Sequence, residues 1–199
     1  GHARDEILSA GGGNDPVYAN AGNDTPVGDA GADRLYGGAG NDTLIGGTGN
    51  DDLSGGAGND VYRYELGDGS DIIYNDGNGA QDMDALEFGA GILPSQVTAE
   101  RQGDSLYLRV GNERVGLFGY FTQDAGTVQT VREIRFADGT IWVVDHLKAM
   151  VIVPNDQAQE IHGYATDDVL SAGGGDDRMY GKAGNDLLQG DAGNDYIYG

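Results

Sequence analysis

The stretch "RLYGGAGNDTLIGGTGNDDLSGGAGND", residues 34–60, repeats one nine-residue pattern three times. Each copy has two adjacent glycines, a third glycine two residues later, then an aspartate and a short apolar segment. Ordering a glycine costs about 0.5–1 kcal/mol relative to alanine, and the repeated aspartates bring like charges together. A folded form of this pattern therefore needs a compensating interaction.

The nine-residue spacing extends along the chain and returns near its C-terminus. The aspartates that keep the step are Asp15, Asp24, Asp33, Asp42, Asp51 and Asp60, then Asp168, Asp177, Asp186 and Asp195. The position two residues after each aspartate is usually apolar, and we expect it to face inward: Val17, Leu35, Leu44, Leu53, Tyr62, Leu170, Met179, Leu188 and Ile197. Pro26 is the exception and predicts a weakened strand, because proline cannot donate to a sheet ladder.

The chain also contains a longer repeat, which is made of many nine-residue units. Residues 1–37 and 163–199 align at an offset of 162, with 22 identical positions, including Tyr18 with Tyr180 and Asp29 with Asp191. Since the chain begins and stops inside patterned sequence, we expect it to be a fragment of a longer tandem array.

The composition limits the classes of function. The 199 residues carry a net charge of −22 and include 37 glycines and no cysteine. The acidic excess argues against nucleic acid and anionic membranes as partners, and the missing cysteines exclude disulfides and thiolate metal sites. No apolar run has the length of a membrane-spanning helix, and no signal-peptide pattern starts the chain.

Between the two blocks, ordinary strand patterns replace the glycine step. "DALEF", "SLYLRV", "VREIRF" and "TIWVV" predict a small antiparallel meander at about 84–153, with turns at "RQGD", "VGNE" and "ADG". "DHLKAM" predicts one or two helical turns. The expected core of this segment is Phe88, Leu106, Leu108, Phe118, Phe121, Ile134, Phe136, Ile141 and Trp142.

The repeat itself predicts a metal site. Two nine-residue units form one coil of eighteen residues, so turns eighteen residues apart stack, for example Asp24 on Asp42 and Asp42 on Asp60. Stacked turns offer carboxylate and carbonyl oxygens, which suit calcium better than the tighter octahedron of magnesium. No imidazole or thiolate recurs, which argues against zinc or copper. Bound calcium would offset both the charge repulsion and the glycine entropy.

This repeat resembles the haemolysin-type calcium-binding repeats of RTX proteins, and "DALEFGAGILPSQV … FADGT" resembles the related domain found beside them. The resemblance implies an all-β fold, in which parallel β-roll blocks flank the small antiparallel meander, with several calcium ions. It also implies type I secretion from a Gram-negative bacterium, with folding outside the cell at millimolar calcium.

The resemblance also supplies a set of candidate ligands, the turn carbonyls and the closing aspartates. The carbonyl positions are Gly28, Gly31, Gly37, Gly38, Ala39, Gly40, Gly46, Gly47, Thr48, Gly49, Gly55, Gly56, Ala57, Gly58, Gly173, Gly175, Gly181, Lys182, Ala183, Gly184, Gly190 and Gly193. The carboxylates are the ten in-frame aspartates and Asp71, which follows Asp60 by eleven residues and predicts a closing turn of altered geometry in "LGDGSD". "ANAGND" at 19–24 lacks the leading glycines, and Glu6 stands where the frame expects aspartate.

We expect three parts: β-roll block I at 1–79, a spacer or capping domain at 80–153, and the start of block II at 154–199. The predicted function is non-catalytic, a calcium-folded part of a large secreted or surface protein, with calcium ions and adjacent tandem modules as partners. We predict no nucleic-acid binding and no membrane insertion. The alternatives are an adhesin segment that binds a glycan or a cell surface, or an accessory C-terminal module of a secreted hydrolase or toxin.

Other interpretations have less support. A disordered linker would not keep apolar residues in a nine-residue frame, and no G-x-x-x-x-G-K-[S/T], H-E-x-x-H or G-x-S-x-G motif occurs. Asp82 and Asp84 in "QDMDALEF" predict a strand-entry turn or a further calcium contact rather than an acid–base pair. We expect the tyrosines to pack in or beside strands rather than to stack on sugars. Some RTX proteins cleave themselves at an Asp–Pro bond, but the Asp15–Pro16 bond lies inside a repeat with no separate processing module, so we do not expect it to be cleaved.

Overall fold

The structure is a computed structural model that describes residues 1–74, 82–121 and 131–199. The described residues form two compact units, one of residues 1–74, 82–121 and 131–147, the other of residues 148–199. Strands dominate both units, and the helices of the described part are α1 (Val144–Met150) and the 3-10 turn η1 (Pro94–Gln96). The all-β class is therefore confirmed.

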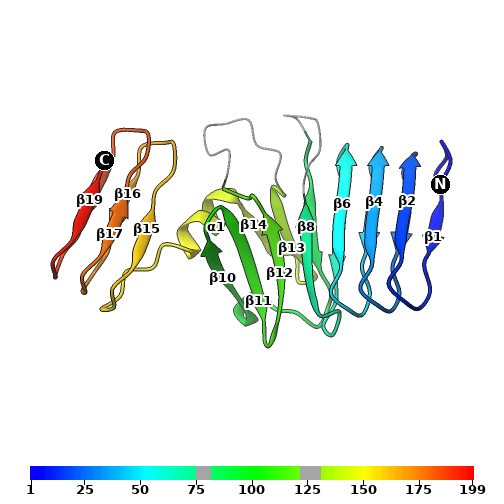
Figure 1. Cartoon of the computed structure of the whole chain (residues 1–199), viewed down its shortest axis with the longest axis horizontal. Coiled ribbons are helices and arrows are strands. Elements are labelled where there is room, and N and C mark those ends of the chain that lie inside the picture. The colour runs from blue at the N-terminus through cyan, green and yellow to red at the C-terminus, as the bar shows by residue number, and fades with distance from the viewer. Residues whose placement is uncertain (75–81, 122–130) are drawn as a thin grey trace. The chain divides into compact units, whose positions relative to one another are not determined.

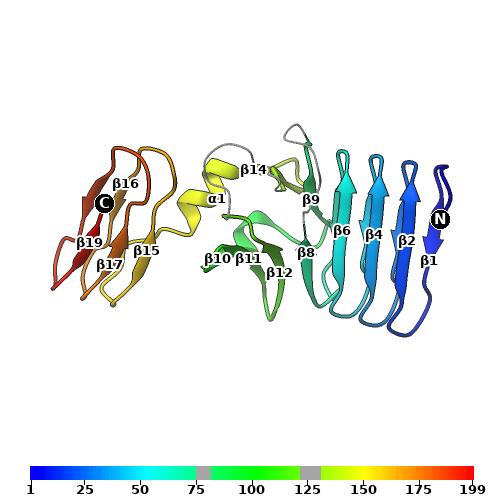
Figure 2. The same ribbon diagram turned by 45° about the horizontal axis from the view of Figure 1, so that its top comes forward.

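In the first unit the chain winds back and forth between two seven-stranded sheets (Figures 1 and 2). The short-strand sheet contains, in spatial order, β1 (Ile7–Ser9), β3 (Thr25–Val27), β5 (Thr43–Ile45), β7 (Val61–Tyr64), β9 (Ala85–Phe88), β13 (Glu133–Phe136) and β14 (Ile141–Val143). The long-strand sheet contains β2 (Pro16–Ala21), β4 (Arg34–Ala39), β6 (Asp52–Ala57), β8 (Ser70–Tyr74), β12 (Glu113–Phe118), β11 (Ser105–Val110) and β10 (Val97–Gln102).

The repeats form a parallel β-roll, as the resemblance implies. Arg34 pairs with Asp52 in the long-strand sheet and Thr43 pairs with Val61 in the short-strand sheet, both eighteen residues apart. The apolar position of each repeat points between the sheets, and Leu35, Leu44, Leu53 and Tyr62 are fully buried there. Pro26 lies inside β3, which pairs with β1 over three residues but registers with β5 only at Val27 and Ile45, the weakening that proline predicts.

The segment after the repeats extends the same two sheets. β9 lies between β7 and β13 and is parallel to both, and β12 is parallel to β8. The predicted antiparallel pairing is present in β10–β11–β12 and in β13–β14, at the expected turns. The predicted boundary between residues 79 and 80 lies outside the described residues, and the three-part division stays a prediction.

Most of the predicted core of this segment is buried, with two exceptions. Phe88, Leu106, Leu108, Phe121, Ile134, Phe136 and Trp142 are buried. The prediction of burial is wrong for Phe118 and Ile141, which are 60% and 53% exposed. The reason is strand alternation, because Leu117 and Trp142, their neighbours in sequence, take the inward direction. "DHLKAM" forms most of α1, as predicted.

The second unit is a smaller roll. One sheet contains β15 (Glu160–His162), β17 (Arg178–Tyr180) and β19 (Tyr196–Tyr198), and the other contains β16 (Val169–Ser171) and β18 (Leu187–Gln189), all parallel. Its core is the cluster of Ile161, Leu170, Ala172 and Met179. Ile197, predicted to face inward, is 48% exposed, because β19 is the outermost strand and has one neighbour.

Candidate metal centres

The aspartates that close the turns form ladders along both rolls. The backbone N–H of Asp24 donates to Oδ1 of Asp42 (2.7 Å), and that of Asp42 donates to Oδ1 of Asp60 (2.8 Å). The other rungs of the predicted stacking join Asp15 to Asp33, Asp33 to Asp51, Asp168 to Asp186, and Asp177 to Asp195. The predicted stacking at eighteen residues is therefore confirmed. Glu6 joins the ladder too, since its N–H donates to Oδ1 of Asp24 (2.8 Å).

A second ladder runs in the opposite sense beside the first. The side-chain oxygen of Asn23 accepts from the N–H of Asn41, and Oδ1 of Asn41 accepts from the N–H of Asn59 (both 2.8 Å). Asp167 and Asp176 take the same role in the second unit. We did not predict this contribution, although its signal is visible in the recurring "ND". Together the two ladders fasten each turn to the next by reciprocal hydrogen bonds.

One oxygen of each interior aspartate stays without a protein partner. The Oδ2 atoms of Asp24, Asp33, Asp42, Asp51, Asp60 and Asp177 are buried and accept no hydrogen bond from the described residues. A buried carboxylate oxygen without a donor or a cation is strongly unfavourable. These atoms therefore mark positions where a positive ion would be stabilising.

The first glycine of a turn leaves room for such an ion. A Cβ atom added to Gly37 would lie 2.4 Å from Oδ2 of Asp42 and 2.6 Å from the carbonyl oxygen of Gly55. In the second unit, a Cβ on Gly163 would lie 2.6 Å from both Oδ2 of Asp168 and the carbonyl oxygen of Gly181. Any side chain would fill this space. We call the space beside the first glycine, bounded by the carboxylate and the next turn's carbonyl, the cage.

Other turn positions are shaped by close backbone stacking. Gly40 has φ +135°, and a Cβ there would lie 1.9 Å from the carbonyl oxygen of Gly22 in the turn before it. The second turn position is more tolerant, because Asn20, Asp29, Lys182 and Asp191 adopt positive φ there. Lys182 thus holds the backbone conformation of the glycine it replaces.

The third turn position already takes part in a hydrogen bond. The carbonyl oxygens of Ala39, Thr48 and Ala57 accept from the N–H groups of Gly22, Gly31 and Gly40 at 2.9–3.0 Å. A carbonyl oxygen has a second lone pair, so this contact leaves one available. Metal ligation by the predicted residues, from Asp15 and Asp24 through Gly193 and Asp195, stays a prediction.

The set of donors fits calcium. Calcium takes six to eight oxygens at about 2.3–2.6 Å and accepts mixtures of carboxylates and carbonyls. Within residues 1–74, 82–121 and 131–199, no three Asp, Glu or His side chains gather closely enough to hold a metal ion by themselves. Each cage therefore has to combine a carboxylate with main-chain oxygens.

Burial disfavours the charged form of several carboxylates in the first unit. Burial raises the pKa of Asp51 to about 6, of Asp60 to about 7 and of Asp71 to about 8. Hydrogen bonds from the neighbouring backbone N–H groups oppose the rise, and the charges of adjacent ladder members add to it. Ionisation near neutral pH therefore destabilises these stacked turns unless a cation is present.

The aspartate ladder of the first unit continues past the regular repeat. Oδ1 of Asp71 accepts from the N–H of Asp51 (2.9 Å), so the closing turn keeps its rung despite a spacing of twenty residues. Oδ1 of Asp84 accepts from the N–H of Asp60 (2.7 Å), across twenty-four residues. For Asp82 and Asp84 the sequence predicts a strand-entry turn or a further calcium contact, and the strand-entry turn is confirmed, because β9 begins at Ala85. No nine-residue frame reaches Asp84, so it is not among the predicted ligands.

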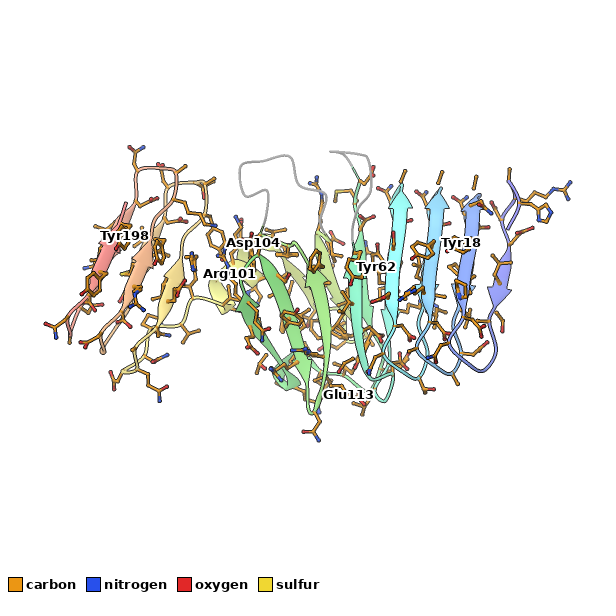
Figure 3. The ribbon with its side chains drawn as sticks, in the orientation of Figure 1. Tyr18, Tyr62, Arg101, Asp104, Glu113 and Tyr198 are labelled. Carbon is orange, nitrogen blue, oxygen red and sulfur yellow. The ribbon has the colours of Figure 1, made fainter. Side chains whose placement is uncertain are left out.

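A residue from the segment after the repeats supports the closing turn. Glu113 (Figure 3) begins β12, and its carboxylate accepts from the N–H of Gly67 (3.1 Å) and from the hydroxyl of Tyr64 (3.2 Å). Tyr64 also donates to the carbonyl oxygen of Gly69 (2.6 Å). Glu113 thereby links the β11–β12 hairpin to the turn that ends at Asp71.

The histidines and tyrosines make structural contacts. His146 packs against Trp142 and His162 stacks on Tyr180. Tyr18 and Tyr36 stack at 4.8 Å between ring centroids, and Tyr180 and Tyr198 stack at 5.2 Å (Figure 3 labels Tyr18 and Tyr198). His2 lies before β1, His146 in α1 and His162 in β15, so the three histidines form no cluster, as their scatter in the sequence predicts.

Comparison with known proteins identifies the repeat. A family model described as the RTX calcium-binding nonapeptide repeat matches in four copies, at residues 1–25, 27–62, 155–188 and 171–199, which together cover more than half of the chain. Iron-regulated protein FrpA of Neisseria meningitidis serogroup C is 40% identical over 118 residues, equal to 58% of this chain and 11% of that protein. The chain thus spans about a tenth of this relative's length.

In the part of the chain that the structure describes, no helix is both long and apolar enough to cross a bilayer.

Proposed function

The chain belongs to the RTX calcium-binding nonapeptide repeat family, and from this premise we propose that it is a calcium-folded segment of a large secreted or surface bacterial protein. Repeats of this family bind calcium ions, so several Ca²⁺ are its cofactors. The single observation that carries the proposal is the row of buried aspartate Oδ2 atoms without a protein donor.

The proposed mechanism is ion-driven folding. Without calcium, ionised ladder aspartates repel one another, and the glycine-rich turns gain more conformational entropy on unfolding than most sequences. The cages would hold calcium through the carboxylate of each closing aspartate and the main-chain oxygens of the stacked turns. Binding free energy then becomes folding free energy, because the cages do not exist in the unfolded chain.

The mechanism supports an extracellular location. Calcium is scarce inside cells and abundant outside, so a chain of this kind would pass through a type I secretion channel unfolded and fold on release. We propose that the segment is non-catalytic, and that adjacent tandem modules continue its roll. The 162-residue offset between Ser9 and Ser171, or Tyr18 and Tyr180, supports this tandem arrangement.

A calcium titration followed by far-UV circular dichroism tests the proposal. We expect a coil spectrum in excess chelator at neutral pH, a cooperative change to β structure as calcium is added, and little response to the same concentration of magnesium. A fully folded spectrum in chelator would contradict the proposal.

A second candidate function is an adhesin segment. The observation in its favour is the exposed tyrosine stacks, in which Tyr18 is 56% and Tyr198 is 54% exposed. Their rings face one another, however, so a sugar would reach only the outermost ring faces. Binding to a glycan array at saturating calcium that is lost on Tyr18→Ala would support this function, and no binding would exclude it for this segment.

A further inference from the structure

The start of the second roll is covered by residues 152–162, which lie directly before it and which we call the covering segment. Residues 163–199 are the counterparts of residues 1–37, and β15, the end of the covering segment, pairs with β17, whose residues correspond to the start of β2. In the first roll β2 is the edge strand of its sheet, with β4 as its neighbour. Equivalent residues are therefore covered in one roll and open in the other.

Two pairs of equivalent glycines show the difference most clearly. A Cβ atom added to Gly173 would lie 2.6 Å from the carbonyl oxygen of Asn155, and one added to Gly174 would lie 3.0 Å from the side chain of the next residue in the covering segment. At their counterparts, Gly11 and Gly12, such a Cβ would have no heavy atom of the described residues within 4 Å apart from its chain neighbours. Gly12 also lacks a positive φ, so the first roll alone gives no reason for a glycine there. A segment that covers this turn would supply the reason.

The covering segment also forms hydrogen bonds with the first turn of the second roll. The N–H of Gln159 donates to Oδ1 of Asp177 (2.7 Å), and the carbonyl oxygen of Asn155 accepts from the N–H of Gly174 (2.8 Å). Asp177 is fully buried, whereas its counterpart Asp15 is half-buried, and the carboxylate of Asp15 accepts no hydrogen bond from the described residues. The equivalent turn of the first roll thus presents an acceptor that could receive the same donor.

Apolar side chains of the covering segment complete the core of the second roll. Ile161 is buried, and Ile152 packs against the cluster that Ile161 forms with three residues of the roll, Leu170, Ala172 and Met179. The counterparts of these three residues in the first roll are half-buried rather than buried: Leu8, Ala10 and Val17. The edge of the first roll therefore offers apolar surface at the positions that the covering segment buries in the second roll.

The chain enters both rolls at the same place. The terminal amino group of Gly1 donates to the carbonyl oxygen of Tyr18 (2.6 Å), as the N–H of Gly163 donates to that of Tyr180 (2.7 Å). His162, directly before Gly163, stacks on Tyr180 at 4.8 Å between ring centroids, whereas Tyr18 is 56% exposed. A segment joined to Gly1 would therefore run along β2 as β15 runs along β17.

Two substitutions limit which contacts carry over to the first roll. Pro16 stands where the second roll has Arg178, whose N–H donates to the carbonyl oxygen of Gln159 (2.9 Å), so the first roll would form one hydrogen bond fewer. His2 stands in place of Tyr164, whose hydroxyl donates to the carbonyl oxygen of Lys148 (3.3 Å). The contacts that carry over are therefore those of residues 152–162.

We propose that the edge formed by β1 and β2 is an interaction surface for an extended segment like residues 152–162, supplied by the module that precedes it in a tandem array. This inference rests on the proposed function, in which such modules follow one another. The segment would add a strand to β2, bury Leu8 and Val17 under apolar side chains, and donate to Asp15. Each 162-residue module would thus build the first coil of the next roll with its last residues.

The test compares the full chain with the same chain extended before Gly1 by the sequence of residues 152–162, "IVPNDQAQEIH". At saturating calcium we expect amide hydrogen exchange in residues 8–18 to slow by about tenfold or more, because the edge gains a neighbour and the N–H of Gly12 gains an acceptor. Exchange in residues 52–64, inside the roll, should stay unchanged. The matched control is an extension of the same length that carries Ile152→Asp and Ile161→Asp, which should give no slowing. Peptide-level mass spectrometry measures all regions in one sample.

The outcomes separate this inference from the function on which it rests. If the unextended chain folds with calcium but the extension leaves exchange in residues 8–18 unchanged, the inference is wrong and the proposed function stands. Equal slowing by both extensions would also overturn the inference, since any added residues would then protect the edge. Slowing that requires high protein concentration would show docking onto a second copy and would overturn the arrangement within one chain. If the unextended chain does not fold with calcium, both proposals are wrong.

Discussion

The two rolls carry the same repeat but bury it to different degrees. In the first unit Asp33, Asp42, Asp51 and Asp60 are at most 1% exposed. In the second unit Asp177 reaches that level, whereas Asp168, Asp186 and Asp195 are half-buried. The aspartates that we propose as calcium ligands are thus the same residue type in both rolls but are buried to different degrees.

The difference follows from the number of stacked coils. A turn with neighbours on both sides is shielded from water, and a turn at the edge of a roll is shielded on one side. The first unit shows the same effect at its own edge, where Asp15 is half-buried and Ile7 is 80% exposed. Because stability in such arrays adds up from neighbouring interfaces, the longer roll should be the more stable one at any calcium concentration.

Removing calcium should have the largest effect and should separate the two rolls. At neutral pH we expect chelator to abolish amide protection in both, and a calcium titration to restore protection in residues 1–74 at lower free calcium than in residues 155–199. Hydrogen exchange with peptide-level mass spectrometry measures both in one sample. Equal midpoints for the two rolls would show that stacking does not control affinity.

Acid should partly replace calcium in the first roll. The folded-state pKa values of about 6 for Asp51, 7 for Asp60 and 8 for Asp71 lie above the ordinary value of 3.8. Folding therefore favours the protonated carboxyl, and the metal-free fold loses stability as pH rises from about 4 to about 8.

In chelator, lowering the pH from about 8 to about 5 should thus increase β structure and amide protection in residues 1–74. At constant high calcium the same change should weaken calcium binding, since protons compete for the carboxylates. A metal-free chain that becomes less ordered on acidification over this range would contradict the raised pKa values.

A matched pair of substitutions tests interior against edge positions. Asp42→Ala removes the acceptor for the N–H of Asp24 and the carboxylate beside Gly37. It should lower the free energy of unfolding by about 1–3 kcal/mol from the lost hydrogen bond alone, and it should also reduce the number of bound calcium ions. Asp195→Ala, in the outermost coil of the second roll, removes the acceptor for Asp177 and should raise the calcium midpoint much less. The comparison of stacking positions fails if Asp195→Ala has the larger effect on the calcium-dependent dichroism.

The smallest effect should come from the exposed tyrosine stack. Tyr36→Ala removes the ring that stacks on Tyr18 and should lower stability by about 0.5–1.5 kcal/mol without changing the number of bound ions. Thermal unfolding at saturating calcium measures the loss. A changed ion count would mean that the stack shapes the turns rather than only covering the sheet.

The sequence predicts the regular part of the fold because the pattern is local. A nine-residue frame fixes which side chains face inward, as Leu35 and Leu44 do, and which aspartates stack. It fails where residues are inserted, because the extra residues before Asp71 and Asp84 break the frame while the backbone keeps its register. Local alternation also cannot show that β9 and β12 pair in parallel with the roll, since those partners are distant in sequence. The asparagines of the Asn23–Asn41 ladder recur in the sequence before the closing aspartates, but an asparagine at this position does not by itself indicate a hydrogen-bond ladder or a metal site.

The most direct test is the anomalous difference density of a crystal grown in excess calcium, with data collected where calcium scatters anomalously. We predict peaks in the cages of the first roll, including one beside Gly37 within bonding distance of Oδ2 of Asp42 and the carbonyl oxygen of Gly55. Well-ordered turns that hold only water at these positions would contradict the account.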